Sequence, residues 1–210
     1  DSKGTIAGEF SGDDCKKDIE SRLSALLAEM PYATSPKPKN LKAKPKPKVF
    51  SALHSPCGLL IHNNLLYIAD TGHNRILECG FDGRVKRVFG NGLPLYLDGM
   101  SSEASFNRPM AMSVAREYLY VADTGNHAIR RVRLMDGFID SLLGNGKPGQ
   151  SEDKTVGLFH EVQLNNPGSV SVEQDILVVA DSGNNCLRMF NLANMAFSSL
   201  VGSGSLGLLD

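Results

Sequence analysis

Residues 65–76 read LLYIADTGHNRI, residues 118–129 read YLYVADTGNHAI, and residues 176–187 read ILVVADSGNNCL. Each stretch holds a short apolar run, then Ala-Asp-Thr/Ser-Gly, then an apolar residue six positions after the aspartate. Aspartate bonds nearby backbone N–H groups and glycine accepts a positive φ, so the tetrapeptide predicts a tight turn between two β-strands. Three copies of one strand–turn–strand unit indicate a repeat protein.

The repeat extends on both sides of this turn. A proline (Pro56, Pro109 or Pro167) opens each copy 14 residues before the turn aspartate, and a Gly-x-Gly closes it. The copies occupy about residues 55–92, 107–146 and 165–204, and the prolines recur 53 and 58 residues apart, a period typical of propeller blades. Each copy divides into four short strands with a second turn, and four antiparallel strands make one blade. The sequence therefore predicts an all-β propeller.

The complete pattern resembles the NHL repeat, in which Pro-x-x-apolar leads to [Tyr/Leu]-[Ile/Val]-Ala-Asp-[Thr/Ser]-Gly-[Asn/His]-[His/Asn]-x-[Ile/Leu]. The stretch LDGMSSEASFNRP, residues 97–109, is similar to the connector of NHL propellers that follow a thioredoxin-like domain in larger proteins. The resemblance covers about residues 50–204 and implies an NHL-type β-propeller with a binding or scaffolding role. It does not reach residues 1–48, where no thioredoxin motif occurs, so no redox function is carried over. The third copy departs slightly, with Ser182 in place of threonine and Asn185-Cys186 in place of His127-Ala128.

The N-terminal part differs in composition from the repeats. Residues 1–34 predict a helical segment, because one helical face collects Ile19, Leu23, Leu26, Leu27 and Met30. This face would dock on its own domain or on another chain, since an isolated helix of this length is marginal in water. Residues 35–49 form a Lys/Pro-rich linker, expected to be extended. A solvated spacer and a basic arm for RNA, anionic lipid or an acidic protein groove are both open.

The number of blades raises the question of how the ring closes. Closed propellers have about four to eight blades, so the repeats of residues 50–210 form an incomplete sector. The end of the sequence, Leu209-Asp210, aligns with Leu97-Asp98 before the second copy. Either the chain is part of a longer protein, or other protein subunits or a second copy supply the missing blades.

Composition excludes some broad classes of protein. The chain has 210 residues, 41% of them apolar, and a net charge of −1, which argues against a strongly basic nucleic-acid binder. No apolar run approaches the roughly 20 residues of a transmembrane helix. Cysteines stand alone, without a Cys-x-x-Cys motif, at Cys15, Cys57, Cys79 and Cys186. Isolated thiols favour a reducing intracellular compartment, the cytoplasm or an organelle interior.

The repeated turns offer candidate site residues, but their repetition favours a structural role, because an active site needs one specific arrangement. These residues are Asp70, Gly72, Asn74, Asp123, Gly125, Asn126, Asp181, Gly183 and Asn184. A metal-dependent propeller lyase or hydrolase would need histidines and carboxylates converging on the central channel. The five histidines have no ligand-like spacing. The sequence predicts no catalytic residue, no metal site and no cofactor.

Positive charge is the feature that varies between copies. A candidate basic interaction patch comprises Arg75, Arg84, Lys86, Arg130, Arg131 and Arg133. It would hold RNA phosphates or an acidic partner, or it is a solvated blade edge that discourages edge-to-edge pairing. The leading hypothesis is a non-catalytic protein-interaction or scaffold module in a larger assembly. An RNA-binding NHL propeller and a metal-dependent propeller enzyme are the alternatives.

Overall fold

The computed structural model describes residues 52–150, 162–194 and 196–202. The chain divides into two compact units, Asp1–Val49 and Phe50–Asp210, and all described residues belong to the second. The helix predicted in residues 1–34 and the linker of residues 35–49 therefore lie outside the described residues.

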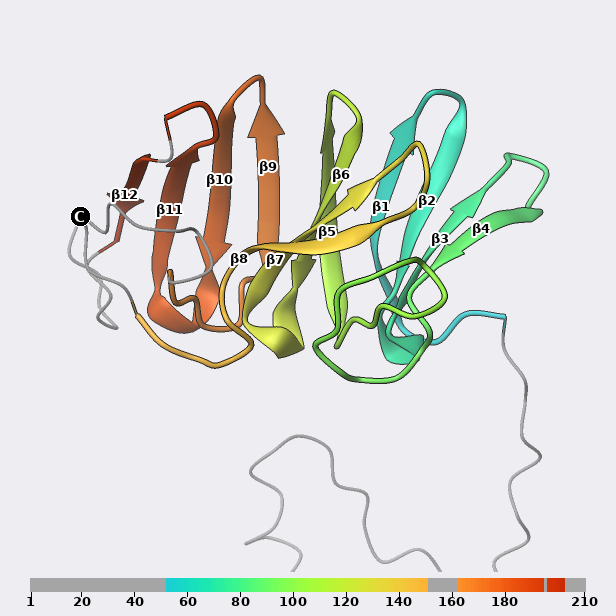
Figure 1. Cartoon of the computed structure of the whole chain (residues 1–210), viewed down its shortest axis with the longest axis horizontal. Helices are drawn as coiled ribbons and strands as arrows, with labels where there is room; N and C mark the ends of the chain where they lie inside the picture. The colour runs from blue at the N-terminus through green and yellow to red at the C-terminus, as the bar shows by residue number, and fades with distance from the viewer. Residues whose placement is uncertain (1–51, 151–161, 195, 203–210) are drawn as a thin grey trace, which may run out of the picture. The chain divides into compact units, whose positions relative to one another are not determined.

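The described residues form three four-stranded antiparallel sheets, which we name blades 1, 2 and 3 in chain order (Figure 1). In each sheet the spatial order of the strands follows their order in the sequence. Blade 1 contains β1 (Pro56–His62), β2 (Leu65–Asp70), β3 (Arg75–Cys79) and β4 (Val85–Phe89). Blade 2 contains β5 (Pro109–Ala115), β6 (Tyr118–Asp123), β7 (Ala128–Arg133) and β8 (Ile139–Leu143). Blade 3 contains β9 (Ser169–Glu173), β10 (Ile176–Asp181), β11 (Cys186–Asn191) and β12 (Ala196–Val201). This architecture confirms the predicted all-β fold with three propeller blades.

A short 3-10 turn joins the second and third strands of every blade: η1 (Thr71–His73), η2 (Thr124–Asn126) and η4 (Ser182–Asn184). One left-handed residue follows each turn, at Asn74, His127 and Asn185, with φ between 51° and 54°. Asn74, Asn126 and Asn184 all lie in these turns, but Asn74 takes the left-handed position whereas Asn126 and Asn184 precede it. His73 is the residue of blade 1 that corresponds to the two inner asparagines.

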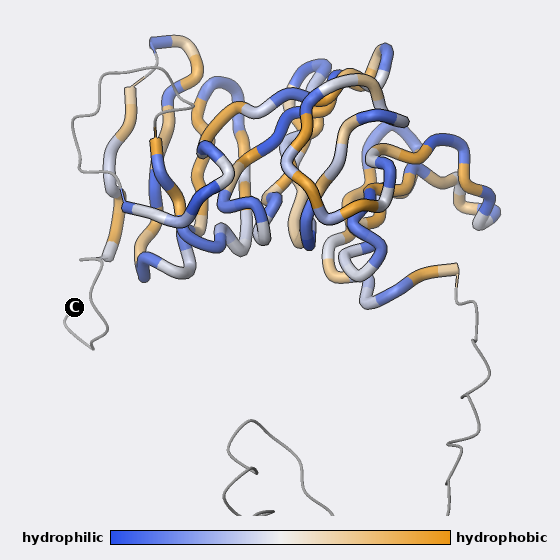
Figure 2. Tube along the Cα trace, turned by 60° about the horizontal axis from the view of Figure 1, so that its bottom comes forward, coloured by the Kyte–Doolittle hydropathy of each residue, from blue (hydrophilic) through white to orange (hydrophobic). Residues whose placement is uncertain are grey.

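The hydrophobic core lies between the blades rather than within one. One face of blade 1 packs on blade 2, where Tyr67, Ala69, Ile76 and Phe89 meet Leu119 and Val121. The equivalent face of blade 2 packs on blade 3 through Tyr120, Ala122, Ile129 and Leu143. Apolar residues accordingly recur along the strands of all three blades (Figure 2). Since each sheet is covered by its neighbour, consecutive blades form the stabilising interfaces.

The first strands of consecutive blades come into direct contact. Gly58 in β1 makes the approach possible, because a Cβ atom at this position would lie 2.3 Å from the Met110 carbonyl oxygen in β5. Glycine is therefore required here by close backbone packing rather than by a turn.

Candidate functional site

The turn aspartates are centres of buried hydrogen-bond networks. In blade 2, Asp123 is fully buried and accepts the Asn107 N–H at 2.7 Å, Asn126 Nδ2 at 2.8 Å and Arg130 Nη1 at 3.0 Å. In blade 3, Asp181 accepts the corresponding bonds from Asn165, Asn184 and Arg188. The donors come from the segment before the first strand, from the turn and from the third strand, so each aspartate ties these three parts of its blade together. This arrangement favours a structural role for the aspartates.

Blade 1 satisfies its turn aspartate in a different way. Asp70 accepts the His54 N–H at 2.7 Å, His73 Nδ1 at 2.8 Å and Arg75 Nε at 2.8 Å. Burial alone would raise the pKa of Asp70, but these donors together hold it below its usual value. The place of Arg130 and Arg188 in the strand register is taken here by Leu77.

The predicted basic patch is largely neutralised. Arg130 is fully buried and contacts two carboxylates, Asp98 at 2.6 Å and Asp123 at 3.0 Å, so its inclusion in a surface patch was wrong. Arg131 pairs with Asp140 and Arg133 with Asp136, each on its own blade. Arg75 pairs with Asp70, as described above. Arg84 and Lys86 of the predicted set are largely exposed, and Arg84 lies 3.7 Å from Asp82 in an exposed ion pair.

The histidines do not build a metal centre in the described part of the chain. His54 and His73 have ring centroids 5.3 Å apart beside Asp70, but each is engaged in the turn network. Across residues 52–150, 162–194 and 196–202, no three His, Cys, Asp or Glu side chains form a group suited to a metal ion. His160 lies outside these ranges.

An apolar surface covers the side of blade 1 that faces away from blade 2. We call it the blade 1 face. It takes alternate residues from all four strands and one from the preceding segment: Leu53, Leu59, Ile61, Leu66, Ile68, Leu77, Cys79, Val85 and Val88. Leu59 and Ile61 are 68% and 66% exposed. No second blade packs on this face among the described residues.

The same register positions are buried in the other two blades. In blade 2 they include Met112, Leu119, Val121 and Val132, which pack against blade 1. In blade 3 they include Leu177, Val179 and Phe190, which pack against blade 2. The blade 1 face is therefore built like a surface that receives a preceding blade.

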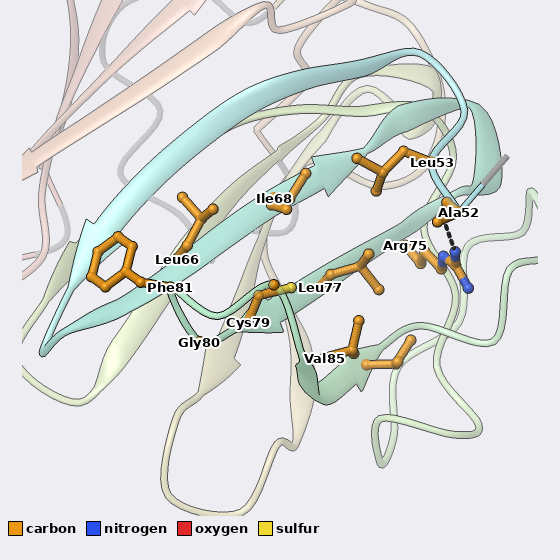
Figure 3. A pocket seen from close by; sticks show the side chains of 12 residues that line it. Ala52, Leu53, Leu66, Ile68, Arg75, Leu77, Cys79, Gly80, Phe81 and Val85 are labelled. Carbon is orange, nitrogen blue, oxygen red and sulfur yellow. Dashed lines mark hydrogen bonds between the residues drawn. The ribbon is translucent and has the colours of Figure 1, made fainter.

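A pocket of about 370 Å³ opens on the blade 1 face (Figure 3). Apart from Arg75, Cys79 and Gly80, its labelled lining residues are aliphatic or aromatic (Figure 3). The single charged lining residue, Arg75, donates from Nη2 to the Ala52 carbonyl at 3.1 Å (Figure 3). The lining of this pocket therefore suits apolar side chains rather than an anion or a metal ion.

Comparisons with known proteins agree with the repeat pattern. No family model matches the chain. It is 38% identical over 91 residues to NHL repeat-containing protein 2 of Bos taurus and 34% identical over 125 residues to the Homo sapiens protein of that name. The chain thus carries repeats similar to those of NHL repeat-containing proteins. The matches cover 43% and 56% of this NHL chain but 12% and 17% of the two relatives.

A plant relative matches over a longer stretch. The Arabidopsis thaliana Protein SUPPRESSOR OF QUENCHING 1, chloroplastic, is 31% identical over 156 residues, which is 70% of the NHL chain and 15% of that protein. The chain thus spans less than a fifth of the length of these curated relatives.

Solved structures support the propeller fold. An auxiliary nutrient binding protein from Bacteroides thetaiotaomicron superposes with a TM-score of 0.50 at 19% identity, over 59% of the NHL chain and 34% of its own. A structural genomics protein of the same species gives a TM-score of 0.50 at 20% identity, over 63% and 31%. At such identities the likeness concerns the fold alone. No helix among the described residues is long and apolar enough to cross a membrane.

The NHL pattern predicted the turns but did not identify the blade 1 face. The sequence does distinguish this face from the equivalent faces of blades 2 and 3. Blade 1 pairs Leu77 with Val88. At the same register positions the other blades pair an arginine with a serine, Arg130 with Ser141 and Arg188 with Ser199. A comparison of the copies strand by strand, rather than turn by turn, would have found it.

Proposed function

We propose that the chain is a non-catalytic protein-interaction module that works within a larger protein assembly. The observation that carries this proposal is the blade 1 face. In blades 2 and 3 the residues at the equivalent register positions are covered by the preceding blade. In blade 1 the side chains of Leu59, Ile61, Val85 and Val88 at this face are 41% to 68% exposed. A contiguous exposed apolar surface is typical of a protein–protein interface.

The alternatives have less support from the described residues. An RNA-binding propeller would use unpaired cations, but Arg130 is buried and Arg131 and Arg133 are paired with carboxylates. A metal-dependent enzyme would use side chains that converge on one point, whereas His54 and His73 serve the turn of blade 1. We also propose a reducing intracellular compartment, since the thiols of Cys57 and Cys79 are free.

Position-specific photocrosslinking tests the interaction role. A photoreactive amino acid would replace Leu59 or Ile61 on the blade 1 face, and Met135 as a control. Met135 is 82% exposed in the turn between β7 and β8 and belongs to blade 2. We expect protein adducts in cells at positions 59 and 61 but not at 135. Adducts with RNA, or no adduct above the level of the control, would overturn the proposal.

A further inference from the structure

Consecutive blades are joined by a pair of hydrogen bonds that we call the junction clasp. At the junction of blades 1 and 2, Thr71 donates from Oγ1 to the Pro109 carbonyl at 2.6 Å. Asn74, the left-handed residue after the turn, accepts the Arg108 N–H on its Oδ1 at 3.0 Å. The turn of one blade therefore holds the two residues at the start of the next blade.

The junction of blades 2 and 3 has the same clasp with a different acceptor. Thr124 donates from Oγ1 to the Pro167 carbonyl at 2.7 Å. His127 takes the left-handed position and accepts the Asn166 N–H on its Nδ1 at 3.1 Å. An imidazole thus serves here where the first junction uses a side-chain amide.

This hydrogen bond fixes the protonation state of the His127 ring. A backbone N–H can only donate, so Nδ1 must keep its lone pair and the ring must be neutral, with its proton on Nε2. A proton on Nδ1 would place two donors 3.1 Å apart, and the bond would be lost. The amide of Asn74 does not titrate, so the clasp of the first junction has no such dependence on pH.

The surroundings of His127 favour the neutral ring. The side chain is half-buried, and burial lowers its pKa below the usual value. The carboxylate of Asp181, at the end of β10, acts in the opposite direction. That carboxylate is itself buried and accepts hydrogen bonds from Asn165, Asn184 and Arg188. The effect of burial is the larger of the two, so the clasp is intact at neutral pH.

The other segments packed against this turn carry little charge. Residues 164–168, which lead into β9, have no titratable side chain. The loop after β8 lies against the His127 carbonyl at Gly144, and Lys147 further along this loop is exposed. The charge of blade 3 that acts on the ring is therefore that of Asp181.

Asp123, in the turn of blade 2, is a second group that titrates near the range of histidine. Burial raises its pKa to about 6, against the effect of the Arg130 guanidinium at 3.0 Å. Its donors are Asn107, Asn126 and Arg130, and none of them is a residue of the clasp with blade 3. A test of His127 must therefore leave Asp123 unchanged.

We propose that the junction of blades 2 and 3 is a pH-sensitive joint, in which protonation of His127 releases the Asn166 N–H while the junction of blades 1 and 2 stays closed. The bond from Thr124 and the apolar interface of the two blades persist, so blade 3 loosens without unfolding. This contribution to stability is present above the unfolded histidine pKa of about 6.5 and is lost as the pH falls through the lower pKa of the folded state. The blade 1 face takes no part in the joint, which would therefore operate whatever partner binds there.

Amide hydrogen exchange tests the joint, followed residue by residue by NMR between about pH 7.5 and 4.5. Each rate is compared with that of an unstructured peptide at the same pH, which gives a protection factor. We expect the protection factor of the Asn166 amide to fall on the order of tenfold towards acid pH, through the loss of one neutral hydrogen bond. The Arg108 amide is an internal control, because its acceptor at the first junction does not titrate.

Two matched variants separate His127 from the other titrating groups. His127→Asn supplies the amide that blade 1 uses at the left-handed position, and it leaves Asp123 unchanged. Its Asn166 amide should stay protected across the whole pH range. Asn74→His should transfer the acid-induced loss of protection to the Arg108 amide.

Three results would overturn the joint. The Asn166 protection factor of the unaltered chain could be independent of pH. It could fall equally in His127→Asn, which would assign the effect to Asp123 or another group. Arg108 could lose protection equally in the unaltered chain, as in general acid unfolding. If circular dichroism shows that His127→Asn does not fold, Asn74→His decides, and an Arg108 amide that keeps its protection there would also refute the joint.

Discussion

The buried arginine of blade 2 offers the sharpest test of how the blades are held together. Arg130 has no exposed surface and gives hydrogen bonds to Asp123 and Asp98 and to the carbonyls of Ser105 and Leu97, the last at 2.7 Å. Replacement by methionine keeps much of the volume but removes the charge. Asp123 then remains buried with only Asn107 and Asn126 as donors.

The expected loss follows from this geometry. Removal of one partner of a buried ion pair costs about 3–5 kcal/mol, because the remaining charge is uncompensated. Such a loss is a large share of a typical domain stability of about 5–15 kcal/mol. The exposed pair of Arg116 and Asp175 gives the contrast, since Arg116→Met should cost about 0–1 kcal/mol.

Urea unfolding followed by far-ultraviolet circular dichroism measures these differences, since the chain has no tryptophan. The double variant Asp123→Asn with Arg130→Met separates charge from packing. We expect it to be more stable than Arg130→Met alone, because it leaves no unpaired buried charge. The reasoning fails if Arg130→Met loses less than about 1 kcal/mol, or if the double variant is no more stable than the single one.

Three further predictions concern the inter-blade contacts and the pH dependence. Gly58→Ala should cost about 1–3 kcal/mol in urea unfolding, because the new methyl group meets the Met110 carbonyl; Gly83→Ala, in open space at φ +78°, should cost only about 1 kcal/mol. Thr71→Val should lose about 1 kcal/mol with the bond to Pro109, while Thr71→Ser retains it; equal losses for both would refute the role of the hydroxyl. Burial, followed by the bond to Glu78, raises the pKa of Tyr67 to about 12. The unfolded chain releases this proton near pH 10, so stability should fall by about 2–3 kcal/mol between pH 10 and 12. Tyr67→Phe should lack this component in unfolding experiments across that range.

Local patterns predicted much of the fold. The Ala-Asp-Thr/Ser-Gly turns lie at η1, η2 and η4, and the strands of each blade fall within the predicted repeat ranges. Alternation along β7 puts Arg131 and Arg133 on one side of the strand. It could not tell which side faces solvent. Arg130 points to the other side, and that side is covered by blade 1, a tertiary contact that strand alternation does not encode.

Two further features could not be predicted from the sequence for a similar reason. Asn74 follows His73, whereas Asn126 precedes His127, and residue type alone does not decide which position takes the left-handed conformation. The blade 1 face escaped notice because its residues are ordinary for a buried strand surface. Their exposure becomes visible only once the sheets are assembled and the order of the blades is known.

The location of the core between blades has a consequence for cooperativity. Each interface involves only two consecutive blades, so the described blades behave as a short linear array with nearest-neighbour coupling. Blade 2 contributes to two such interfaces, and blades 1 and 3 to one each. A defect in blade 2 therefore uncouples both neighbours, whereas a defect in an outer blade is confined to one end of the array.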